Sequence, residues 1–246
     1  MDAMILAAGL GTRLRPLTDH TPKPLIPVAG VPMLERVARR LIAAGADRLI
    51  VNTSHLSEQV EAFLREREGF GVEWHVSREP GEPLETGGAI LQGAPLFRQD
   101  APFFLHNADV LTDLPLAAMY RAHELSDPLA TLAVMERETS RHLLFDDRGL
   151  LGRMDAKKAL DLRVRDAVGE VRSLAFGGVH VISPRIFGLL TESGAFSILD
   201  PYLRLAAAGE TILPFRVDDF TWIDIGRPEQ LEAAHAAAAR LDHGVT

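Results

Sequence analysis

The chain has 246 residues, a formal net charge of −8 and no cysteine. Its length fits one larger domain or two very small ones, and 47% hydrophobic residues are enough for a sizeable core. The acidic balance argues against a duplex-binding surface, so we expect no nucleic-acid partner. Without cysteine the chain has no disulfide, thiolate zinc site or cysteine nucleophile.

The sequence also bears on location and domain organisation. No apolar run is long enough to span a bilayer, and Asp2 stands where a signal peptide would need a basic residue. We therefore expect a cytoplasmic protein without a membrane partner. Since no linker or internal repeat interrupts the chain, residues 1–246 are expected to form one domain. The oligomeric state is left open.

Residues 1–25 carry the strongest chemical pattern. The apolar run from Ala3 to Ala8 predicts a buried strand that ends in a glycine turn. Gly9 and Gly11 let phosphate oxygens approach successive backbone N–H groups. Arg13 adds a planar fork for phosphate, and Lys23, between two prolines that favour extended backbone, adds a point charge from a loop. Together they indicate a polyphosphate site, and an ordinary strand–turn–helix junction with surface charges is the alternative.

The next segment alternates helices and strands. This alternation indicates right-handed βαβ units and a mainly parallel sheet. Ligands of such sheets bind beyond the carboxyl ends of the strands, so Gly9, Asn52 and the loop after Ser77 are expected at one edge. The predicted elements are a helix from Met33 to Ala44 with Pro32 as its first residue, a strand from Leu49 to Val51, a helix capped by Thr53 or Ser54 that runs to about Glu66, and a strand from Val72 to Ser77.

Two further loops carry candidate binding residues. A helix is predicted from about Thr86 to Gln92, and the glycines at its start permit close approach to a base or ribose. A glycine-tolerant turn capped by Thr86 is the alternative. The strand from Pro102 to His106 leads to Asp109, whose carboxylate at the mouth of a parallel strand is well placed for Mg²⁺. Turn capping is the alternative for Asp109.

The second half of the chain is predicted as further strands and helices. We interpret the charged segment from Asp155 to Asp166 as an exposed connection rather than a mobile flap over a ligand. Two glycines interrupt the strand from Ser173 to Ile182, which marks a bulge or a close ligand approach, and His180 within it is interpreted as a packing residue. The other predicted elements are a helix from Leu116 to Leu125, a strand from Leu129 to Met135, a hairpin from His142 to Met154, a helix from Ile198 to Ala208, a strand from Thr211 to Val217 and a helix from Glu229 to Leu241.

These motifs together resemble those of the sugar nucleotidyltransferases, which make an NDP-sugar and pyrophosphate from an NTP and a sugar 1-phosphate. The resemblance rests on G-L-G-T-R-L-R-P-L-T with P-K-P-L-I-P-V, on L-E-T-G-G, on F-G-G-V-H-V and on W-I-D-I-G, and it covers nearly the whole chain. It implies the nucleotide-diphospho-sugar transferase fold, a single-domain Rossmann-like three-layer αβα architecture with a mainly parallel mixed sheet. Because the sequence stops after the predicted terminal helix, we expect no C-terminal β-helix domain of the kind that bifunctional relatives carry.

The resemblance implies roles for individual residues. Arg13, Lys23 and Asp109 are the expected catalytic residues, with Arg13 on the departing pyrophosphate and Lys23 on the α-phosphate or sugar phosphate. Asp109 and Asp224 are expected to bind Mg²⁺ together. The expected nucleotide-binding residues are Leu6, Ala7, Ala8, Gly9, Gly11, Thr12, Arg13, Glu85, Gly87 and Gly88.

On the sugar side, the resemblance implies that Asn107 and Gly178 face the substrate. Ala108 departs from the glycine that the family usually has before the metal-binding aspartate, and its methyl group is expected to tighten the approach to ribose or metal. The length and the P-L-E-T-G-G loop resemble short N-acetylmuramate 1-phosphate uridylyltransferases and mannose 1-phosphate guanylyltransferases. We predict UTP with an N-acetylmuramate-type sugar, and GTP with mannose 1-phosphate as the alternative.

Three other functions compete with this interpretation. A dinucleotide-binding oxidoreductase would need a third glycine where Leu14 stands and a ribose-binding acid where the second strand ends in Asn52. A cytidylyltransferase for a non-sugar phosphate shares the phosphate-binding turn, and the F-G-G strand counts only weakly against it. A non-catalytic nucleotide sensor is disfavoured because the expected catalytic and metal-binding side chains are all present.

Overall fold

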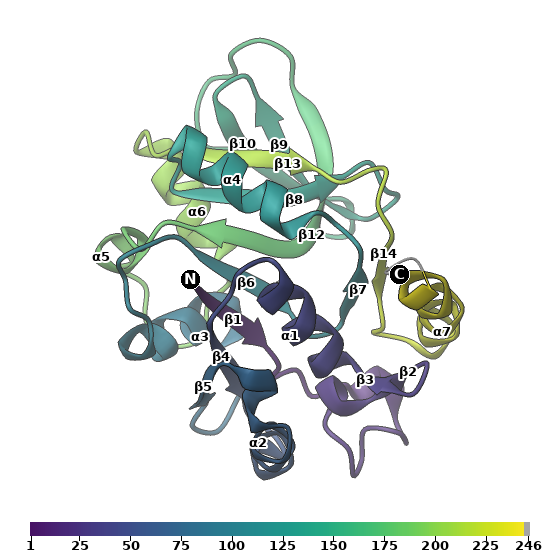
Figure 1. The fold of residues 1–246 in the computed structure, drawn as a ribbon. Helices are drawn as coiled ribbons and strands as arrows, with labels where there is room; N and C mark the ends of the chain where they lie inside the picture. Colours follow the sequence, from purple (N-terminus) through teal and green to yellow (C-terminus); the bar gives the residue numbers. More distant parts are fainter. Residues whose placement is uncertain (244–246) are drawn as a thin grey trace.

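The structure, a computed structural model, describes residues 1–243, with side chains described up to Leu241. Its centre is a ten-stranded sheet with helices on both faces, and two short strand pairs lie outside this sheet (Figure 1). The strands are β1 (Asp2–Leu6), β2 (Pro27–Val28), β3 (Val31–Pro32), β4 (Arg48–Thr53), β5 (Glu73–Arg78), β6 (Phe103–Asn107), β7 (Val110–Thr112), β8 (Ala130–Met135), β9 (Arg141–Asp146), β10 (Gly149–Asp155), β11 (Leu160–Arg163), β12 (Arg172–Ile182), β13 (Ile212–Arg216) and β14 (Trp222–Asp224).

The strand directions confirm the predicted mainly parallel mixed sheet. The block β6-β1-β4-β5 is parallel throughout. Strand β12 runs antiparallel to β6, β8 and β9, whereas β13 is parallel to β8. Strand β10 runs antiparallel to both β9 and β11. Within the ten-stranded sheet, β10 and β12 therefore run opposite to the other eight strands.

The helices form the outer layers of the predicted αβα arrangement. Helices α1 (Met33–Ala43), α2 (Ser57–Glu66) and α4 (Leu116–Ser126) pack into the hydrophobic core on one face of the sheet. Helices α3 (Glu85–Gly93), α5 (Ile186–Leu189) and α6 (Leu199–Ala207) pack into the core on the other face. Helix α7 (Pro228–His243) lies beside β2 and β14 instead (Figure 1). Short 3-10 turns cover Thr12–Leu14, Lys23–Leu25, Glu68–Gly71, Ala94–Leu96 and Ala156–Lys158.

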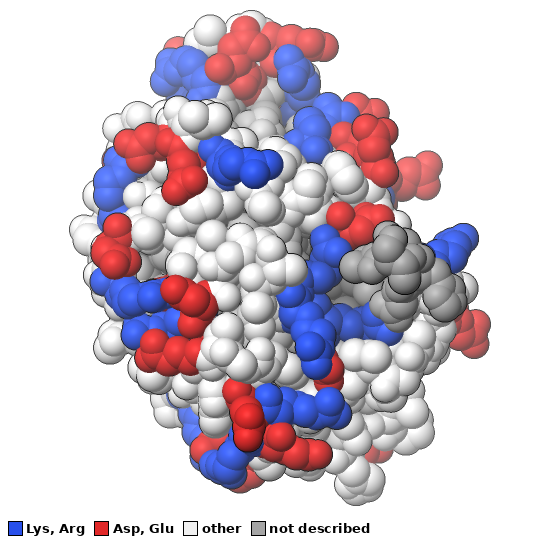
Figure 2. All heavy atoms as spheres, viewed as in Figure 1, with Lys and Arg blue, Asp and Glu red and all other residues white. Residues whose placement is uncertain are grey.

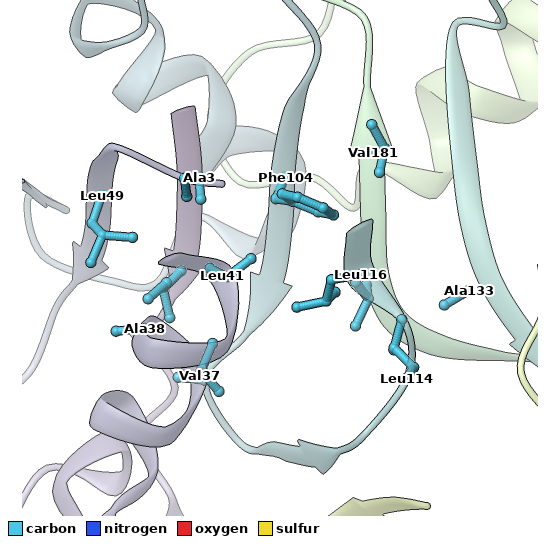
Figure 3. Packing of buried hydrophobic residues seen from close by; sticks show 14 of the residues in the cluster. Ala3, Val37, Ala38, Leu41, Leu49, Phe104, Leu114, Leu116, Ala133 and Val181 are labelled. Carbon is cyan, nitrogen blue, oxygen red and sulfur yellow. The ribbon is translucent and has the colours of Figure 1, made fainter. Parts of the chain in front are cut away.

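Side-chain alternation along the central strands fills both cores. Ala3 faces the core with α1, and Met4 faces the core with α3, because successive residues of a strand point to opposite faces. Figure 3 shows Val37 and Leu41 of α1 on the first of these faces, near Phe104 of β6. Leu41 is fully buried, and burial of a side chain of this size contributes about 1.5–3 kcal/mol. This packing fixes the carboxyl ends of the parallel strands, where ligands of such sheets bind.

The structure corrects the predicted starts of two helices. Pro32 precedes α1 rather than opening it, because its backbone is extended at φ −56° and ψ 141° and it pairs with Pro27. Helix α2 begins only at Ser57, after Leu56 in the left-handed region at φ 55°. Neither predicted cap is used there, and Thr53 is the last residue of β4.

The segment from Asp155 to Asp166 is neither a flap nor a plain connection. Leu160–Arg163 forms β11, which pairs with β10 at the edge of the sheet. Its exposed charged residues Asp161 and Arg163 suit an edge strand, because charges discourage pairing with another chain. The short helix α5 was not predicted, since a single turn is too short to show a helical period.

Two surface features concern the predicted partners. None of the helices in the described part of the chain combines the length and apolar character of a membrane span. Figure 2 shows basic and acidic side chains mixed over much of this face, with a group of neighbouring basic side chains at its centre right.

Buried histidines should make stability depend on pH. His180 is 1% exposed and its Nδ1 lies 3.2 Å from the Tyr202 hydroxyl, which supports the predicted packing role. Burial lowers the pKa of His180 from 6.5 to about 3. At a pH between these two pKa values, His180 is protonated in the unfolded chain and neutral in the folded chain. The free energy of unfolding should therefore fall as the pH drops below 6.5, by about 2 kcal/mol at pH 5 from this residue alone.

Urea unfolding at pH 7 and pH 5 measures this effect. The variant His180→Gln should show a smaller loss of stability between the two pH values than the wild type. His106 and His123, whose pKa values burial also lowers to about 4, account for the dependence that stays in the variant. An unchanged loss in the variant would contradict the assignment to His180.

Candidate active site

The glycine turn after β1 folds over Lys23. The Thr18 hydroxyl donates to the carbonyl oxygen of Gly11 at 2.9 Å. Gly11 has φ 64°, and a Cβ there would lie 2.8 Å from Thr18 Cγ2 and 3.2 Å from Lys23 Cβ, so a side chain would strain this turn. In contrast, a Cβ at Gly9 would meet no atom within 4 Å. The turn is thus closely packed at Gly11, next to Lys23, whereas the space beside Gly9 is open.

Lys23 reaches both predicted metal-binding acids. It begins a 3-10 turn, so the predicted loop is wrong in this detail, although Pro22 before it is extended as expected. Its Nζ forms an ion pair with Asp109 and lies 4.0 Å from Asp224 Oδ1. The Lys23 side chain is only 10% exposed, and a lysine so buried needs a paired carboxylate to stay charged at low cost.

The two acids meet through a strand pair that sequence reasoning missed. Strand β14 pairs antiparallel with β7, with Asp224 opposite Val110 (Figure 1). The Ile225 N–H donates to the carbonyl oxygen of Asp109 at 2.9 Å and extends this pairing. Each strand has three residues, too few to show a strand pattern in the sequence. Asp109 and Asp224, far apart in the chain, therefore come together at the mouth of β6.

The acid pair has the properties of a divalent-cation site. Burial, followed by the Asp109 carboxylate, raises the pKa of Asp224, and Lys23 opposes this rise. Asp224 Oδ1 is buried without a hydrogen-bond partner. A carboxylate oxygen in that state beside a second carboxylate fits a hard cation such as Mg²⁺, which also takes phosphate and water oxygens. Among the side chains described, up to Leu241, no group of three or more histidine or acidic side chains could hold a metal ion, so these residues offer an ion two carboxylates at this site.

Arg13 lies near Asp224, beside Gly226. A Cβ built at Gly226 would lie 2.8 Å from both Arg13 Nη2 and Asp224 Oδ1, so this glycine leaves room for the two groups to stay close. The Arg13 charge helps to lower the pKa of Asp224 against the effect of burial. The structure thus brings together the four side chains predicted for phosphate and metal binding.

A cavity of about 210 Å³ opens next to the acid pair. It lies at the carboxyl ends of β1, β4 and β6, as the rule for parallel sheets predicts. Six predicted site residues are among those that line it: Leu6, Ala8, Gly9, Glu85, Asn107 and Asp109. The lining also includes Asn52, Glu79, Pro83 and Thr86. Gly9, Asn52 and the loop after Ser77 therefore share one edge, as expected.

A buried polar network holds the loop along this cavity. Asn52 Nδ2 donates to Glu79 Oε1 at 2.8 Å, and the Leu84 N–H donates to Glu79 Oε2 at 2.8 Å. Sequence reasoning placed Asn52 at this edge without giving it a role, and it missed Glu79. An amide at the end of a parallel strand was the available signal for Asn52, whereas nothing in the local pattern pointed to Glu79.

Gly87 and Gly88 do not line the cavity. The Gly87 N–H donates to the Phe196 carbonyl oxygen at 2.8 Å, and a Cβ there would lie 2.2 Å from the Phe196 ring. A Cβ at Gly88 would lie 2.4 Å from the Gly194 carbonyl oxygen. The close approach that these glycines permit is thus to residues 194–196. The other predicted nucleotide-binding residues outside the lining are Ala7, Gly11, Thr12 and Arg13.

The structure also rules out the alternative interpretation of Thr86 and corrects the expectation for Ala108. Thr86 is not a cap, because it lies inside α3 and its hydroxyl accepts a hydrogen bond from the Ile198 N–H at 2.9 Å. Ala108 donates its N–H to the Leu6 carbonyl oxygen at 3.0 Å, and its 3% exposed side chain belongs to the core with α1. Its methyl group therefore packs in the core, and this departure from glycine does not narrow the cavity.

The predicted sugar-side residues touch each other beside the acid pair. Gly178 has φ 75°, and a Cβ there would lie 2.6 Å from Asn107 Nδ2. The register between β12 and β8 shifts between Phe176 and His180, which agrees with the bulge, one of the two features expected from the glycines of this strand. Trp222 Nε1 donates to the Gly177 carbonyl oxygen at 2.7 Å and so ties this bulge to β14.

The fold and this site define an enzyme of the nucleotidyltransferase class, with a cavity, a lysine and two convergent carboxylates at one sheet edge. The family model described as "Nucleotidyl transferase" matches residues 2–146. The chain belongs to this family, whose members typically use a divalent metal.

Curated relatives and solved structures agree with this membership. The chain is 35% identical over 239 residues to the N-acetylmuramate alpha-1-phosphate uridylyltransferase of Neisseria meningitidis, covering 97% of this chain and 98% of that protein. It is 30% identical to the mannose-1-phosphate guanyltransferase of Yarrowia lipolytica, covering 93% of this chain and 61% of that protein. A solved UDP-glucose pyrophosphorylase with UDP-glucose shares the fold with a TM-score of 0.76 at 20% identity, over 97% of this chain and 98% of that one.

Proposed function

We propose that this protein transfers a nucleotidyl group from UTP to N-acetylmuramate 1-phosphate and releases pyrophosphate. The observation that carries the reaction class is the placement of Lys23 between Asp109 and Asp224, beside a cavity at the edge of the parallel block. The likeness to the Neisseria uridylyltransferase over nearly the full length of both chains supports the choice of substrates.

In this proposal the base and ribose of UTP occupy the cavity lined by Leu6, Asn52 and Glu85. The phosphates lie along the open side of the turn at Gly9, where the space beside the backbone is free within 4 Å of a built Cβ. Arg13 binds the departing pyrophosphate. Because the net charge is −8, the protein must concentrate a few cations at this point rather than rely on its overall field.

The chemistry is then positioning and charge neutralisation. Asp109 and Asp224 are the residues that would hold Mg²⁺, which when bound neutralises phosphate charge and orients the α-phosphate. Lys23 donates to an α-phosphate oxygen once the nucleotide is bound. A phosphate oxygen of the sugar 1-phosphate attacks the α-phosphorus in line, and the bond from that phosphorus to the pyrophosphate oxygen breaks. Asn107 and Gly178 face the sugar.

A second candidate is GTP with mannose 1-phosphate, which the likeness to the Yarrowia guanyltransferase favours. It would use the same acids and cations, because only the base and the sugar differ.

A cytoplasmic location fits both candidates, since a chain without cysteine suits a reducing compartment.

A substrate panel tests the proposal. Pyrophosphate release is measured with ATP, GTP, CTP and UTP, each against N-acetylmuramate, N-acetylglucosamine, glucose and mannose 1-phosphates. The expected result is the highest kcat/KM for UTP with N-acetylmuramate 1-phosphate. The highest kcat/KM for GTP with mannose 1-phosphate would replace the proposed substrates with the alternative. Nucleotide binding without pyrophosphate release from any pair would indicate a non-catalytic sensor.

A further inference from the structure

Two arginines near the acid pair have no part in the mechanism above. Arg137, on the loop between β8 and β9, is exposed, and its Cζ lies 4.4 Å from the centroid of the Trp222 ring. Arg141 begins β9 and is also exposed. Neither side chain forms an ion pair or a hydrogen bond with another residue in the described part of the chain. Both guanidinium groups therefore keep their N–H donors available.

The charge of Arg137 interacts electrostatically with Asp224 and with Arg141. Partial burial lowers the pKa of Arg137, the Asp224 carboxylate opposes this shift, and the Arg141 charge lowers the pKa further. The arginines are thus within electrostatic reach of one another, although their mutual repulsion disfavours that arrangement. An anion between them would relieve the repulsion.

The loop that carries Arg137 is held at both ends. The Glu136 N–H donates to Asp218 Oδ1 at 2.6 Å, and Arg216 Nη2 donates to the Glu136 carboxylate at 2.8 Å. At the other end, the Ala156 N–H donates to the Ser140 carbonyl oxygen at 2.7 Å. These bonds, with the stacking on Trp222, restrict where the Arg137 guanidinium can lie. A positioned cation loses less entropy on binding an anion than a free one does.

Strand geometry places Arg137 on the sugar side of the site. Trp222 and Asp224 are two residues apart on β14, so their side chains lie on the same face of that strand. Arg137 stacks on Trp222 and therefore lies on the face that carries Asp224. Trp222 in turn donates to Gly177, next to the Gly178 that touches Asn107. Arg137 does not line the nucleotide cavity.

An arginine at a second cavity has its hydrogen-bond donors occupied. Arg165 borders a cavity of about 250 Å³, but its guanidinium already donates to Asp146 at 2.6 and 2.7 Å. Such a bidentate pair uses the donors that an anion would need. Unlike Arg165, Arg137 therefore has N–H donors that remain available to bind an anion.

We propose that Arg137, stacked on Trp222, forms a subsite for an oxyanion of the sugar substrate and acts as a specificity-determining residue. This subsite rests on the proposed function. A guanidinium presents paired N–H donors that match a carboxylate and a phosphate alike. The sugar 1-phosphate supplies one such group, and a carboxylate substituent, as on N-acetylmuramate, supplies a second. Stacking on Trp222 holds the cation in a partly dehydrated position, where these bonds gain strength.

Steady-state kinetics of Arg137→Gln with saturating UTP test the subsite and identify the oxyanion. The two substrates are N-acetylmuramate 1-phosphate, which has a phosphate and a carboxylate, and N-acetylglucosamine 1-phosphate, which has the phosphate alone. The KM for the sugar substrate is expected to rise on the order of 10-fold to 100-fold, as for loss of a charged hydrogen bond, with the KM for UTP unchanged. A rise for both sugars identifies the 1-phosphate, and a rise for N-acetylmuramate 1-phosphate alone identifies the carboxylate.

Matched variants separate this role from a structural one. Arg137→Lys should recover part of the affinity for the sugar, since it keeps the charge but loses the planar fork. Arg163→Gln, an exposed arginine on the edge strand β11, should leave every KM unchanged. If Arg137→Gln leaves the KM of both sugars unchanged in an active enzyme, the subsite does not exist. A wild-type enzyme that releases no pyrophosphate with any sugar overturns the proposed function instead.

Discussion

The variant Asp109→Asn is expected to lose detectable NDP-sugar synthesis while it keeps the fold. Asparagine preserves the shape of the side chain but removes the charge that faces Lys23 and that would hold the metal beside Asp224. A metal ion at a phosphoryl group contributes several kcal/mol of charge stabilisation, so the rate should fall by about 10³-fold or more. Pyrophosphate release measures the loss, and thermal unfolding followed by circular dichroism checks the fold.

A matched variant shows whether the loss belongs to this carboxylate. Asp161→Asn changes an exposed aspartate on the edge strand β11 and should retain wild-type turnover. Asp224→Asn should lose activity to a similar extent, because the two carboxylates act on the same ion. Near wild-type synthesis by Asp109→Asn would show that the metal assignment is wrong.

Replacing Lys23 with alanine is expected to lower kcat/KM by about 10²-fold or more, as for the loss of comparable charge-stabilising donors. The variant removes the cation proposed to contact the α-phosphate, and it leaves Asp109 and Asp224 without the positive charge with which both now interact. The unneutralised carboxylates should also repel the phosphates and so weaken binding of the nucleoside triphosphate. Pyrophosphate release at varied UTP separates the effects on kcat and KM.

Lys158→Ala is the control for that variant, because Lys158 is an exposed lysine in the 3-10 turn before β11. It should leave kcat/KM for UTP unchanged. If Lys23→Ala also has an unchanged kcat/KM and the same melting temperature as the wild type, Lys23 does not belong to the active site.

The sequence predicts the sheet and its ligand-binding edge because both follow from the order of strands and helices along the chain. Strands that alternate with helices pair in parallel, and their carboxyl ends then lie at one edge. This is why Gly9, Asn52 and the loop after Ser77 are found together around one cavity. The position of Asp109 follows in the same way from the end of β6.

Other parts of the site depend on contacts between distant segments. Strands β7 and β14 are three residues each, so the meeting of Asp109 with Asp224 was expected from the family resemblance and not from a local pattern. The glycines of α3 indicated that some group approaches closely, but a sequence does not say which, and the group is the chain at residues 194–196. Arg137 gave no sequence signal, because its position depends on Trp222, far away in the chain.

The shared metal ion is tested most directly by crystals grown with a non-hydrolysable UTP analogue and Mn²⁺ in place of Mg²⁺. Anomalous scattering locates the ion independently of any assumption about its ligands. We predict one Mn²⁺ coordinated by carboxylate oxygens of both Asp109 and Asp224 and by a phosphate oxygen of the nucleotide. An ion bound elsewhere in the site, with either aspartate outside its coordination sphere, would contradict the proposed role of this acid pair.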